Sequence, residues 1–422
     1  MPTDGSPVRW SRPDIAVLGI GLAVGIAIRL VLLPTQGLRD DLDQFAGWVH
    51  HIATNGLGML YTENPAGPVT FGPVMGYVWG SLAAVQPAFQ TVTDASDTGI
   101  RMLMKAPASV ADVALALLAA FALRDRPRWA VVAAVVILVH PAVAYVSAWW
   151  GQYESIFLLS GLAATVAALR GHNGLAAVLV AVSLMTKPQA LPFVVPFAAW
   201  FWASGYARTG ARGGVLELVR TGLIGLATIV VLWLPFIPAG GPADYLHNLG
   251  VYQNEIFNVL SLRAWNAWWL VQEAAAGGAF IADDVAFLGP LTLRHVGYAV
   301  TVLLEVGIAL AIVRDPRPRT LVLGLAASVL VVFALMTQMH ERYAYGAVIF
   351  LVLLVADGRW RWLGVAFGVV FTLNLVAAIP PTPAVGASVP VAGPLGVAGS
   401  VAMLLVMAIV LAGLRRRTVP PT

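Results

Sequence analysis

Two short polar segments and a set of cationic residues stand out in a chain that is otherwise rich in apolar residues. The first segment holds three carboxylates. Asp40, Asp41 and Asp43 follow an apolar run over residues 13–34. A carboxylate held at such a place can act as a general base that takes the proton of an attacking hydroxyl. Aspartate is also a favoured N-cap residue, so the same spacing fits the cap of a helix that begins near Leu42. The local pattern leaves both interpretations open.

The second polar segment lies at residues 149–155 and contains Gln152 and Glu154. An amide next to a carboxylate can orient a sugar by hydrogen bonds. Its two tryptophans, Trp149 and Trp150, fit the aromatic belt that marks a membrane interface. A belt does not explain Gln152 and Glu154, which are therefore candidate site residues.

The third group is cationic and consists of Arg29, Arg101, Lys105, Lys187 and the segment 338–343, Gln-Met-His-Glu-Arg-Tyr. A Lys or Arg at the centre of a membrane span costs about 2.5–3.5 kcal/mol on insertion scales, so each needs a partner or a function. Snorkelling of the side chain to the interface accounts for Arg29 and Lys105. Asp112 lies in the middle of an apolar run and is expected to pair with Lys105 or with a residue of another helix.

Snorkelling explains Lys187, His340 and Arg342 less well, because they fall where the chain turns between apolar runs. Cationic side chains that gather beneath a loop are what binding a lipid phosphate requires. These three residues are the candidate phosphate ligands.

Composition places all of these groups in a membrane protein. The chain has 422 residues, of which 59% are hydrophobic and only 11% are charged. A soluble domain carries roughly 25% charged residues, so a cytosolic globular protein is excluded. The absence of cysteine excludes disulfides and thiolate sites. The net charge of +4 comes from clusters in short connections, so it reports topology and does not indicate nucleic acid.

The positive-inside rule predicts how many apolar runs cross the membrane. The basic clusters are Arg9/Arg12, Arg124/Arg126/Arg128, Arg170, Arg208/Arg212/Arg220, Arg314 to Arg319, Arg359/Arg361 and Arg415 to Arg417. About twelve crossings place them all on the cytoplasmic side. The expected spans are 13–34, 101–123, 128–147, 154–170, 174–187, 189–204, 216–236, 295–314, 320–336, 343–357, 362–380 and 390–414. The first is expected to be retained, since no cleavage site follows it.

A further apolar stretch, 69–88, would reverse the side of every later cluster if it crossed. It is therefore expected to be a juxtamembrane or re-entrant helix on the outer face. The chain is expected to form one integral membrane domain over residues 1–422. Residues 35–100 form its first outer loop, the catalytic one, with juxtamembrane helices, and 237–294 form its second large outer loop.

Taken in order, the polar motifs resemble those of the bacterial GT-C fold glycosyltransferases, polytopic enzymes that use polyprenyl-phosphate sugars. The motifs cover about residues 20–350 and are Asp41-x3-Phe45-x2-Trp48, Gly56 and Tyr61, Trp150-Gly-Gln-x-Glu154, Lys187-Pro-Gln189, Asn266-x-Trp268-Trp269 and His340-Glu-Arg-Tyr343. The resemblance implies an all-α polytopic membrane protein, a GT-C helical bundle of about 12 transmembrane helices with juxtamembrane helices in the first outer loop.

The resemblance also implies roles for the residues that match. Asp41 is expected to be the general base, because its spacing to Phe45 and Trp48 fits the family pattern, with Asp43 as the runner-up and Glu154 as a further catalytic carboxylate. The donor phosphate is expected to contact Lys187, His340, Arg342 and Arg101. Substrate contacts are expected from Trp150, Gln152, Gln189, Asn266 and Trp268.

The implied reaction is inverting transfer of a sugar from a polyprenyl-phosphate donor to a glycan, lipid or protein of the cell envelope. It takes place at the outer face of the cytoplasmic membrane. Mannose is the first expectation, with arabinose and glucose open. A lipid phosphate is a good leaving group, so no carboxylic general acid is needed. A divalent cation, Mg or Mn, shared by Asp41 and Glu154 stays open, although the sequence has no dedicated ligand cage.

Two positions depart from the family pattern. The usual tyrosine-proline-proline segment appears only as Asn64-Pro-Ala-Gly-Pro68 with Phe71-Gly-Pro73, and Glu154 stands where relatives usually have Asp.

Two other classes of protein compete with the transferase. A transporter or flippase of lipid-linked sugars would use the same cations, but it usually shows related halves and interrupted helices. Only the Lys187-Pro188 break offers that here. A scaffold or sensor would not need acids and bases gathered on one side.

Overall fold

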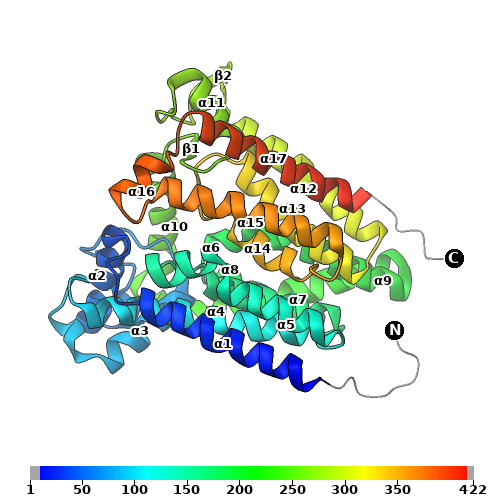
Figure 1. Cartoon of the computed structure of the whole chain (residues 1–422), viewed down its shortest axis with the longest axis horizontal. Coiled ribbons are helices and arrows are strands. Elements are labelled where there is room, and N and C mark those ends of the chain that lie inside the picture. Colours follow the sequence, from blue (N-terminus) through cyan, green and yellow to red (C-terminus); the bar gives the residue numbers. More distant parts are fainter. Residues whose placement is uncertain (1–9, 416–422) are drawn as a thin grey trace.

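The computed structural model describes residues 10–415, so Arg9, Arg416 and Arg417 of the predicted basic clusters lie outside it. Most of the long helices lie side by side along the long axis of the molecule (Figure 1). They are α1 (Arg12–Leu32), α4 (Thr98–Ala122), α5 (Pro127–Val139), α7 (Glu154–Leu169), α8 (Asn173–Leu184), α9 (Val194–Trp233), α12 (Leu293–Arg314), α13 (Pro318–Leu335), α15 (Gly358–Ala378) and α17 (Pro394–Arg415), with the shorter α6 (Pro141–Ala144), π-helix η3 (Tyr145–Trp150) and α14 (Tyr345–Val352).

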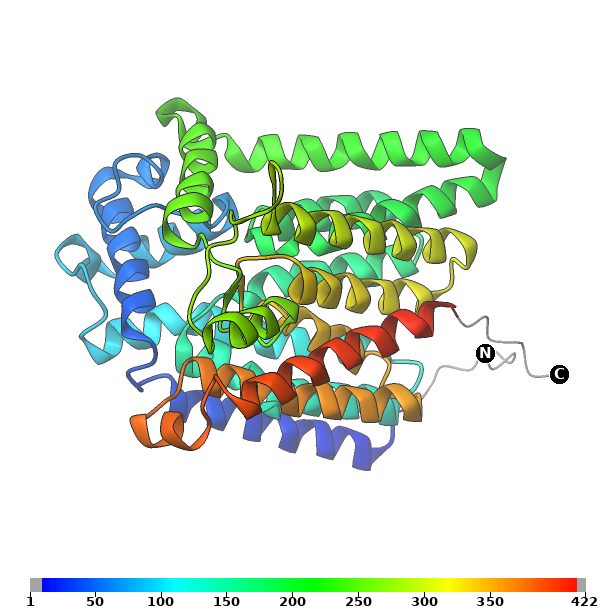
Figure 2. The ribbon, with the colours of Figure 1, turned by 90° about the horizontal axis from the view of Figure 1, so that it is seen from above.

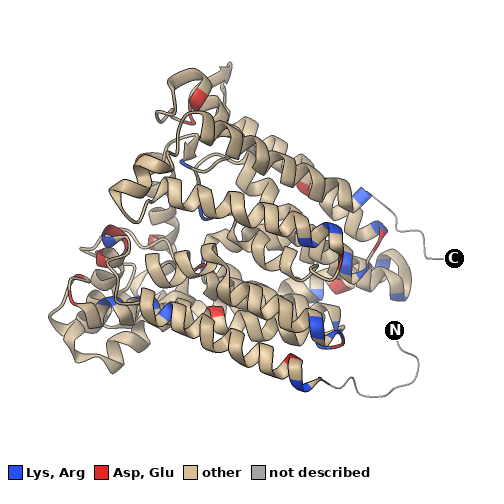
Figure 3. Ribbon diagram, in the orientation of Figure 1, with Lys and Arg blue, Asp and Glu red and all other residues tan. Residues whose placement is uncertain are grey.

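The two ends of this bundle differ, and we name them the loop end and the basic end. The loop end carries α2 (Arg39–Asn55), η1 (Leu57–Met59), α3 (Pro73–Val85), η2 (Pro87–Gln90), η4 (Pro188–Phe193), η5 (Ile237–Ala239), α10 (Gly241–Val251), η6 (Tyr252–Ile256), α11 (Ala267–Ala276) and α16 (Pro383–Ser388). The basic end is where α1 begins and α17 ends, and most of the Lys and Arg residues gather there (Figure 3). Both predicted outer loops thus lie at the end away from the arginine clusters.

Length and hydropathy show a multi-pass membrane protein. Within residues 10–415, seven helices are long and apolar enough to cross a membrane, or eight if the bent pair of α5 with residues 141–150 counts as one. Shorter apolar helices, α7 and α8, lie among them. Every expected span overlaps a helix of the structure. The count of twelve crossings stays a prediction.

Two predicted spans, 189–204 and 216–236, lie mostly on the single element α9. Thr209 and Gly210 have non-helical backbone angles within it, with φ of +67° at Gly210. Glycine adopts this left-handed region without steric cost, so the chain can reverse there. Figure 2 shows the resulting pair of long arms along one side of the bundle. Glu217 closes the turn by accepting hydrogen bonds from Asn173, Arg208 and Arg220.

Within the stretch 69–88 the structure forms α3, a helix of 13 residues. Such a helix is about 20 Å long, which is too short to cross a hydrocarbon core of roughly 30 Å. Its start is attached to the break between α8 and η4. The amides of Gly72 and Val74 donate to the carbonyls of Thr186 and Met185, each at 3.1 Å. A side chain at position 72 would collide with the Met185 carbonyl.

A cluster of aromatic rings holds α2 and α3 on the bundle. Phe45 and Trp48 of α2 pack against Phe71, Trp79 and Tyr153, with ring centroids of Trp48 and Trp79 5.1 Å apart. All five side chains are buried. Large aromatic rings contribute most of the apolar area in such a contact, so Phe45 and Trp48 position α2.

Two small sheets join the loops. Strands β1 (Ser261–Leu262) and β4 (Met339–His340) pair in parallel, with Leu262 opposite His340. Strands β2 (Ala286–Leu288) and β3 (Leu291–Thr292) form an antiparallel hairpin before α12. The first pair attaches the second large loop to the segment that follows α13.

Candidate active site

A cavity of about 540 Å³ opens at the loop end. Its walls come from segments far apart in the sequence: α2, the turn after η3, the start of η4, η6 and the segment 336–343. The predicted site residues that line it are Asp41, Trp150, Gln152, Lys187, Gln189, His340 and Arg342. Seven of the twelve residues proposed from the sequence therefore meet at one cavity.

Asp41 is the carboxylate of the first polar segment that reaches this cavity. Its Oδ2 accepts hydrogen bonds from Trp150 Nε1 at 2.8 Å and from Gln152 Nε2 at 2.5 Å. Among the described residues, no group donates to its Oδ1. Asp41 lies in the first turn of α2, where the helix dipole favours an anion. One oxygen is fixed by two donors and the other stays available to a ligand.

The other two carboxylates of the segment do not reach the cavity. Asp43 accepts hydrogen bonds from Arg39 and from the amide of Ala95, both at 2.8 Å. Asp40 is exposed to solvent. The N-cap interpretation is wrong for all three, because Leu38 occupies the N-cap position and no side chain caps α2. The structure thus shows which of the three carboxylates reaches the cavity, a distinction that sequence spacing alone could not make.

The turn that delivers Trp150 and Gln152 depends on a glycine. Gly151 follows η3 with φ of +97°, and a Cβ there would lie 2.5 Å from Leu42 of α2. Only glycine satisfies both the left-handed backbone and the close approach. This contact brings the indole and amide donors onto Asp41.

Lys187 continues the chain of contacts away from Asp41. Its Nζ donates to Gln152 Oε1 at 3.1 Å and to Glu154 Oε1 at 2.6 Å, and it lies 4.9 Å from the centroid of the Phe71 ring. Lys187 and Glu154 are almost fully buried. The closest partner of the ammonium is thus a carboxylate that does not itself line the cavity.

Arg342 is the cation with unused hydrogen-bonding capacity. Its Nη1 donates to Glu341 Oε1 at 3.1 Å, and its Nε lies 3.3 Å from Glu154 Oε1. That Nε is buried and makes no hydrogen bond to any described residue. The guanidinium lies 5.0 Å from the Trp150 ring centroid, within reach of a cation–π contact.

His340 contributes hydrogen bonding and no charge. Burial, reinforced by Arg342 and Lys187, lowers its pKa well below the ordinary value of 6.5. The ring is therefore neutral at pH 7. Arg342 Nη1 lies 3.2 Å from His340 Nδ1. Because arginine can only donate, Nδ1 accepts and the ring proton is on Nε2.

Two further polar atoms near the cavity are buried and unpartnered among residues 10–415. They are Gln189 Oε1 and Glu154 Oε2. A buried acceptor without a partner costs free energy, which a ligand can offset by donating a hydrogen bond. Gln189 lines the cavity, so its amide is placed to meet a substrate.

Three residues proposed from the sequence lie elsewhere. Arg101 donates to the carbonyls of Ala95 and Ser96 and fixes the loop before α4. Asn266 caps α11 and donates to the Phe333 carbonyl at 3.1 Å. Trp268 Nε1 donates to the Leu335 carbonyl at 2.7 Å. These contacts anchor backbone segments, and none of the three residues lines the cavity.

The structure also reveals a buried carboxylate behind the cavity, Asp283, that the sequence did not indicate. Asp283 is fully buried and accepts hydrogen bonds from Arg294 at 2.7 Å, Thr337 at 2.6 Å and Gln338 at 3.0 Å. Gln338 has a left-handed backbone, with φ of +64°. Asp283 thus holds the segment that leads to His340. No motif marked it, because its partners lie 11, 54 and 55 residues away in the sequence.

The residues do not fit an ion shared between Asp41 and Glu154. The cation beside Glu154 is the Lys187 ammonium, which also contacts Gln152. In the described part of the chain, no three side chains of His, Asp or Glu gather as a metal site.

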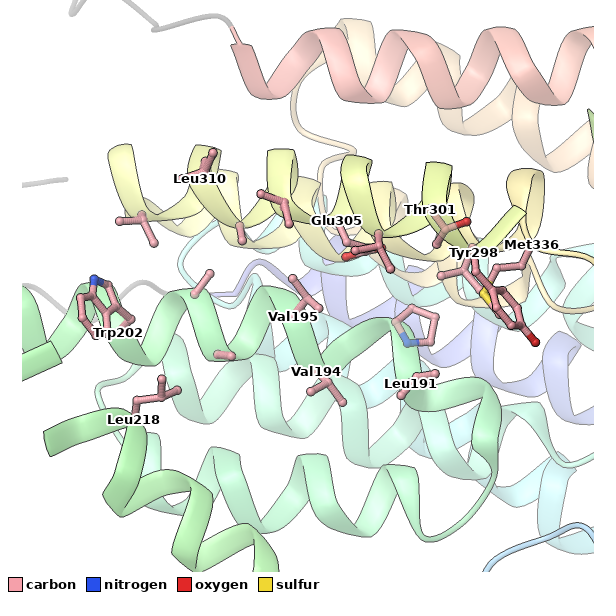
Figure 4. Close-up of a pocket in the computed structure, with 18 residues that line it drawn as sticks. Leu191, Val194, Val195, Trp202, Leu218, Tyr298, Thr301, Glu305, Leu310 and Met336 are labelled. Carbon is pink, nitrogen blue, oxygen red and sulfur yellow. The ribbon is translucent and has the colours of Figure 1, made fainter. Parts of the chain in front are cut away.

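An apolar groove of about 960 Å³ adjoins the cavity. It lies between α9 and α12, lined by side chains such as Leu191, Val195, Val302 and Leu310 (Figure 4). Tyr298 and Met336 line both the groove and the cavity. A polar cavity therefore adjoins a mostly apolar groove between two membrane helices.

Comparison with known proteins places the chain in a family. A sequence model of the ALG6, ALG8 glycosyltransferase family matches residues 77–380. Among solved structures, the chain is similar to the archaeal oligosaccharyltransferase AglB from Archaeoglobus fulgidus, in complex with an inhibitory peptide and a dolichol-phosphate, at 13% identity and a TM-score of 0.47. That match covers 97% of this chain and 56% of AglB, so the chain spans little more than half of that protein. The comparison with curated proteins finds no match.

Proposed function

The chain belongs to the ALG6, ALG8 glycosyltransferase family, and from that premise we propose that it transfers a sugar from a polyprenyl-phosphate donor to a hydroxyl of a cell-envelope acceptor. The observation that carries the proposal is the single cavity that Asp41 and Arg342 both line, beside the groove between α9 and α12. A general base, a phosphate ligand and a site for a hydrocarbon chain are the three parts that such a reaction needs.

The base step uses the free oxygen of Asp41. The acceptor hydroxyl gives its proton to Oδ1 as its oxygen attacks the anomeric carbon. Trp150 and Gln152 hold Oδ2 and so fix the carboxylate plane. The bond between the anomeric carbon and the phosphate oxygen breaks from the opposite face, so the configuration inverts. The sugar ring acquires oxocarbenium character in the transition state.

The leaving phosphate keeps the bonding electrons and is stabilised by donors already in place. Arg342 Nε has no hydrogen-bond partner in the described part of the chain, and a neutral His340 offers Nε2–H. Removing one such preorganised hydrogen-bond donor lowers the reaction rate about 10²–10³-fold. Lys187 is paired with Glu154. We therefore assign it two roles: it holds Gln152 by a hydrogen bond, and its positive charge favours an anion in the cavity.

The groove between α9 and α12 suits the lipid part of the donor. Its walls are mostly aliphatic and aromatic, with Thr301 and Glu305 as polar exceptions. Tyr298 and Met336, which line both the groove and the cavity, lie where the phosphate would pass into the hydrocarbon chain. Burying an isoprenoid chain there contributes about 25 cal/mol for each Å² of apolar surface removed from water.

Several finer assignments are part of the proposal. The loop end faces outward from the cytoplasmic membrane, because the arginine clusters gather at the other end (Figure 3). Mannose is the sugar we propose first, on the resemblance of the motifs. The acceptor is a glycan, lipid or protein of the envelope. A flippase would need the same cavity and groove, but it would need no general base.

Asp41→Asn tests the proposal in proteoliposomes supplied with a polyprenyl-phosphate sugar and envelope acceptors. Asparagine keeps the shape of the side chain but cannot take a proton, so transfer is expected to fall by at least about 10²-fold. Asp40→Asn, an exposed neighbour, is the matched control and should transfer at the wild-type rate. Transfer by Asp41→Asn near the wild-type rate, with loss in Asp43→Asn, would move the base to Asp43. Translocation without transfer in the wild-type protein would identify a flippase.

A further inference from the structure

Asp112 is a buried carboxylate in the middle of α4 that the proposed reaction does not use. It was expected to pair with Lys105 or with another helix. Lys105 instead donates to the Thr35 carbonyl at 2.7 Å. The partner is Arg29 of α1, whose Nε and Nη2 lie 2.9 and 2.7 Å from Asp112 Oδ2. Arg29 does not snorkel, since its side chain is only 3% exposed.

Three hydroxyls complete the coordination of Asp112. Ser147 donates to Oδ2 and Ser155 to Oδ1, and the Tyr345 hydroxyl lies 3.3 Å from Oδ1 and 2.9 Å from Ser155 Oγ. All of these side chains are buried. Asp112 thus joins four elements besides its own: α1, η3, α7 and α14.

Three of these four elements lead to a residue that lines the cavity, and the fourth, α7, begins at Glu154, the partner of Lys187. Helix α1 is joined by residues 33–38 to α2, which carries Asp41. Element η3 ends at Trp150, and Ser155 adjoins Glu154. Tyr345 lies three residues after Arg342. The base, its indole donor and the proposed phosphate ligand therefore all extend from segments that meet at one carboxylate.

Stability alone does not account for such a group. Two charges lose their hydration when they are buried, and apolar residues of similar volume are often as stabilising as the ion pair they replace. What apolar side chains cannot supply is direction, because hydrogen bonds fix the angle between segments and dispersion contacts do not.

We propose that Asp112, with Arg29, is a positioning residue for the transfer: it sets the relative placement of the segments that carry Asp41, Trp150 and Arg342. This inference rests on the proposed function. Misplacing reacting groups by about 1 Å can cost on the order of 10²-fold in rate.

The test is the paired replacement Arg29→Met with Asp112→Leu, which removes both charges and leaves apolar side chains of similar size. The melting temperature is expected to stay at or above that of the wild type, while kcat falls at least about tenfold and the donor KM changes less than about twofold. Wild-type kcat in this stable double variant would overturn the inference.

A milder variant covers the case in which the double variant does not fold. Tyr345→Phe removes only the hydroxyl that contacts Ser155 and Asp112, and kcat is expected to fall several-fold at unchanged donor KM. An unchanged kcat here would also count against the inference. Glu217→Gln is the control, since Glu217 is a buried carboxylate with three partners at the basic end. It should lower the melting temperature and leave kcat unaltered.

A distance measurement makes the test independent of activity. The chain has no cysteine, so spin labels can be attached at Asp40→Cys on α2 and Glu255→Cys on η6, both exposed positions. The distribution of distances between them should broaden in the paired variant and stay narrow in Glu217→Gln. Broadening in a protein that transfers no sugar would leave the positioning role standing and overturn the proposed function. A narrow distribution with wild-type kcat would overturn the positioning role only.

Discussion

His340 and Arg342, the two proposed phosphate ligands, illustrate how neighbouring residues can contribute different properties to one site. The guanidinium carries the charge, and the imidazole is kept neutral because it is buried beside two cations. A neutral ring adds a donor without adding repulsion toward Arg342. The sequence indicated a cluster of three cations. The structure resolves it into two cations that are both paired with carboxylates, of which Arg342 keeps an Nε without a hydrogen bond to any described residue, and one neutral donor.

The lowered pKa of His340 predicts how stability depends on pH. The unfolded chain protonates histidine near its ordinary pKa of about 6.5, whereas the folded protein does so only at a much lower pH. Below about pH 6.5 the unfolded state therefore binds more protons, and the free energy of unfolding falls as the pH falls. His340→Gln removes the titratable group and with it this contribution to the pH dependence of stability. We expect its melting temperature to decline less than that of the wild type between pH 7.5 and 5.5. Parallel declines in the two proteins would show that His340 is protonated in the folded state.

Residue types and spacing predicted those parts of the site that lie in short motifs. Asp41, Gln152, Lys187 and Arg342 stand out because packing does not explain polar groups beside apolar runs. The same reasoning selected Arg101 and Asn266, which the structure assigns to anchoring loops. A motif shows that a polar residue needs partners, but it does not show whether these are backbone carbonyls or a ligand.

At the scale of elements, the groove between α9 and α12 predicts how the KM for the donor depends on the length of the donor's lipid chain. Ala309 lines the groove and lies eleven residues beyond Tyr298, roughly 16 Å along α12. Ala309→Trp should obstruct the far part of the groove. We expect the KM for a long-chain donor to rise about tenfold, while a donor whose chain ends short of this position is unaffected.

Leu303→Trp is the matched control, because Leu303 is 70% exposed and does not line the groove. It should leave the KM of both donors unchanged. Equal effects of Ala309→Trp on long and short donors would place the donor chain elsewhere.

Helices were predictable from apolar runs, and their breaks were only partly so. Lys187-Pro188 marked the end of α8 because proline cannot continue a helix. The π-helical turn η3 left no comparable signal, although it aims Trp150 at Asp41. Its geometry follows from contacts with α2 and α4, which local sequence does not encode.

At the scale of the whole molecule, the separation of charge predicts sidedness. Ser81→Cys at the loop end and Asp125→Cys at the basic end both introduce an exposed thiol into a chain without cysteine. In right-side-out vesicles, an impermeant thiol reagent should label Ser81→Cys directly and Asp125→Cys only after permeabilisation. The reverse pattern would place the cavity on the cytoplasmic side.

Long-range pairs set the limit of what the sequence predicts about the whole fold. Arg29 and Asp112 are separated by 83 residues. Snorkelling was the wrong expectation for Arg29, whereas pairing with another helix was one of the two alternatives for Asp112, although the sequence did not show which residue the partner would be. Asp283 and Thr337 are likewise brought together only by the assembled bundle. Periodicity predicts the spans one by one, and the partners of their buried charges depend on how the spans pack.

The residues that line the cavity are far apart in the sequence, so the ribosome makes them at different times. Asp41 is made early and Arg342 late, with about 300 residues between them, which takes roughly 15–60 s at typical rates of synthesis. During that interval the nascent chain carries the proposed base without the guanidinium. On the proposed roles, a chain truncated before residue 342 is therefore expected to be inert toward the donor, and activity is acquired only after the helices up to α13 have been made.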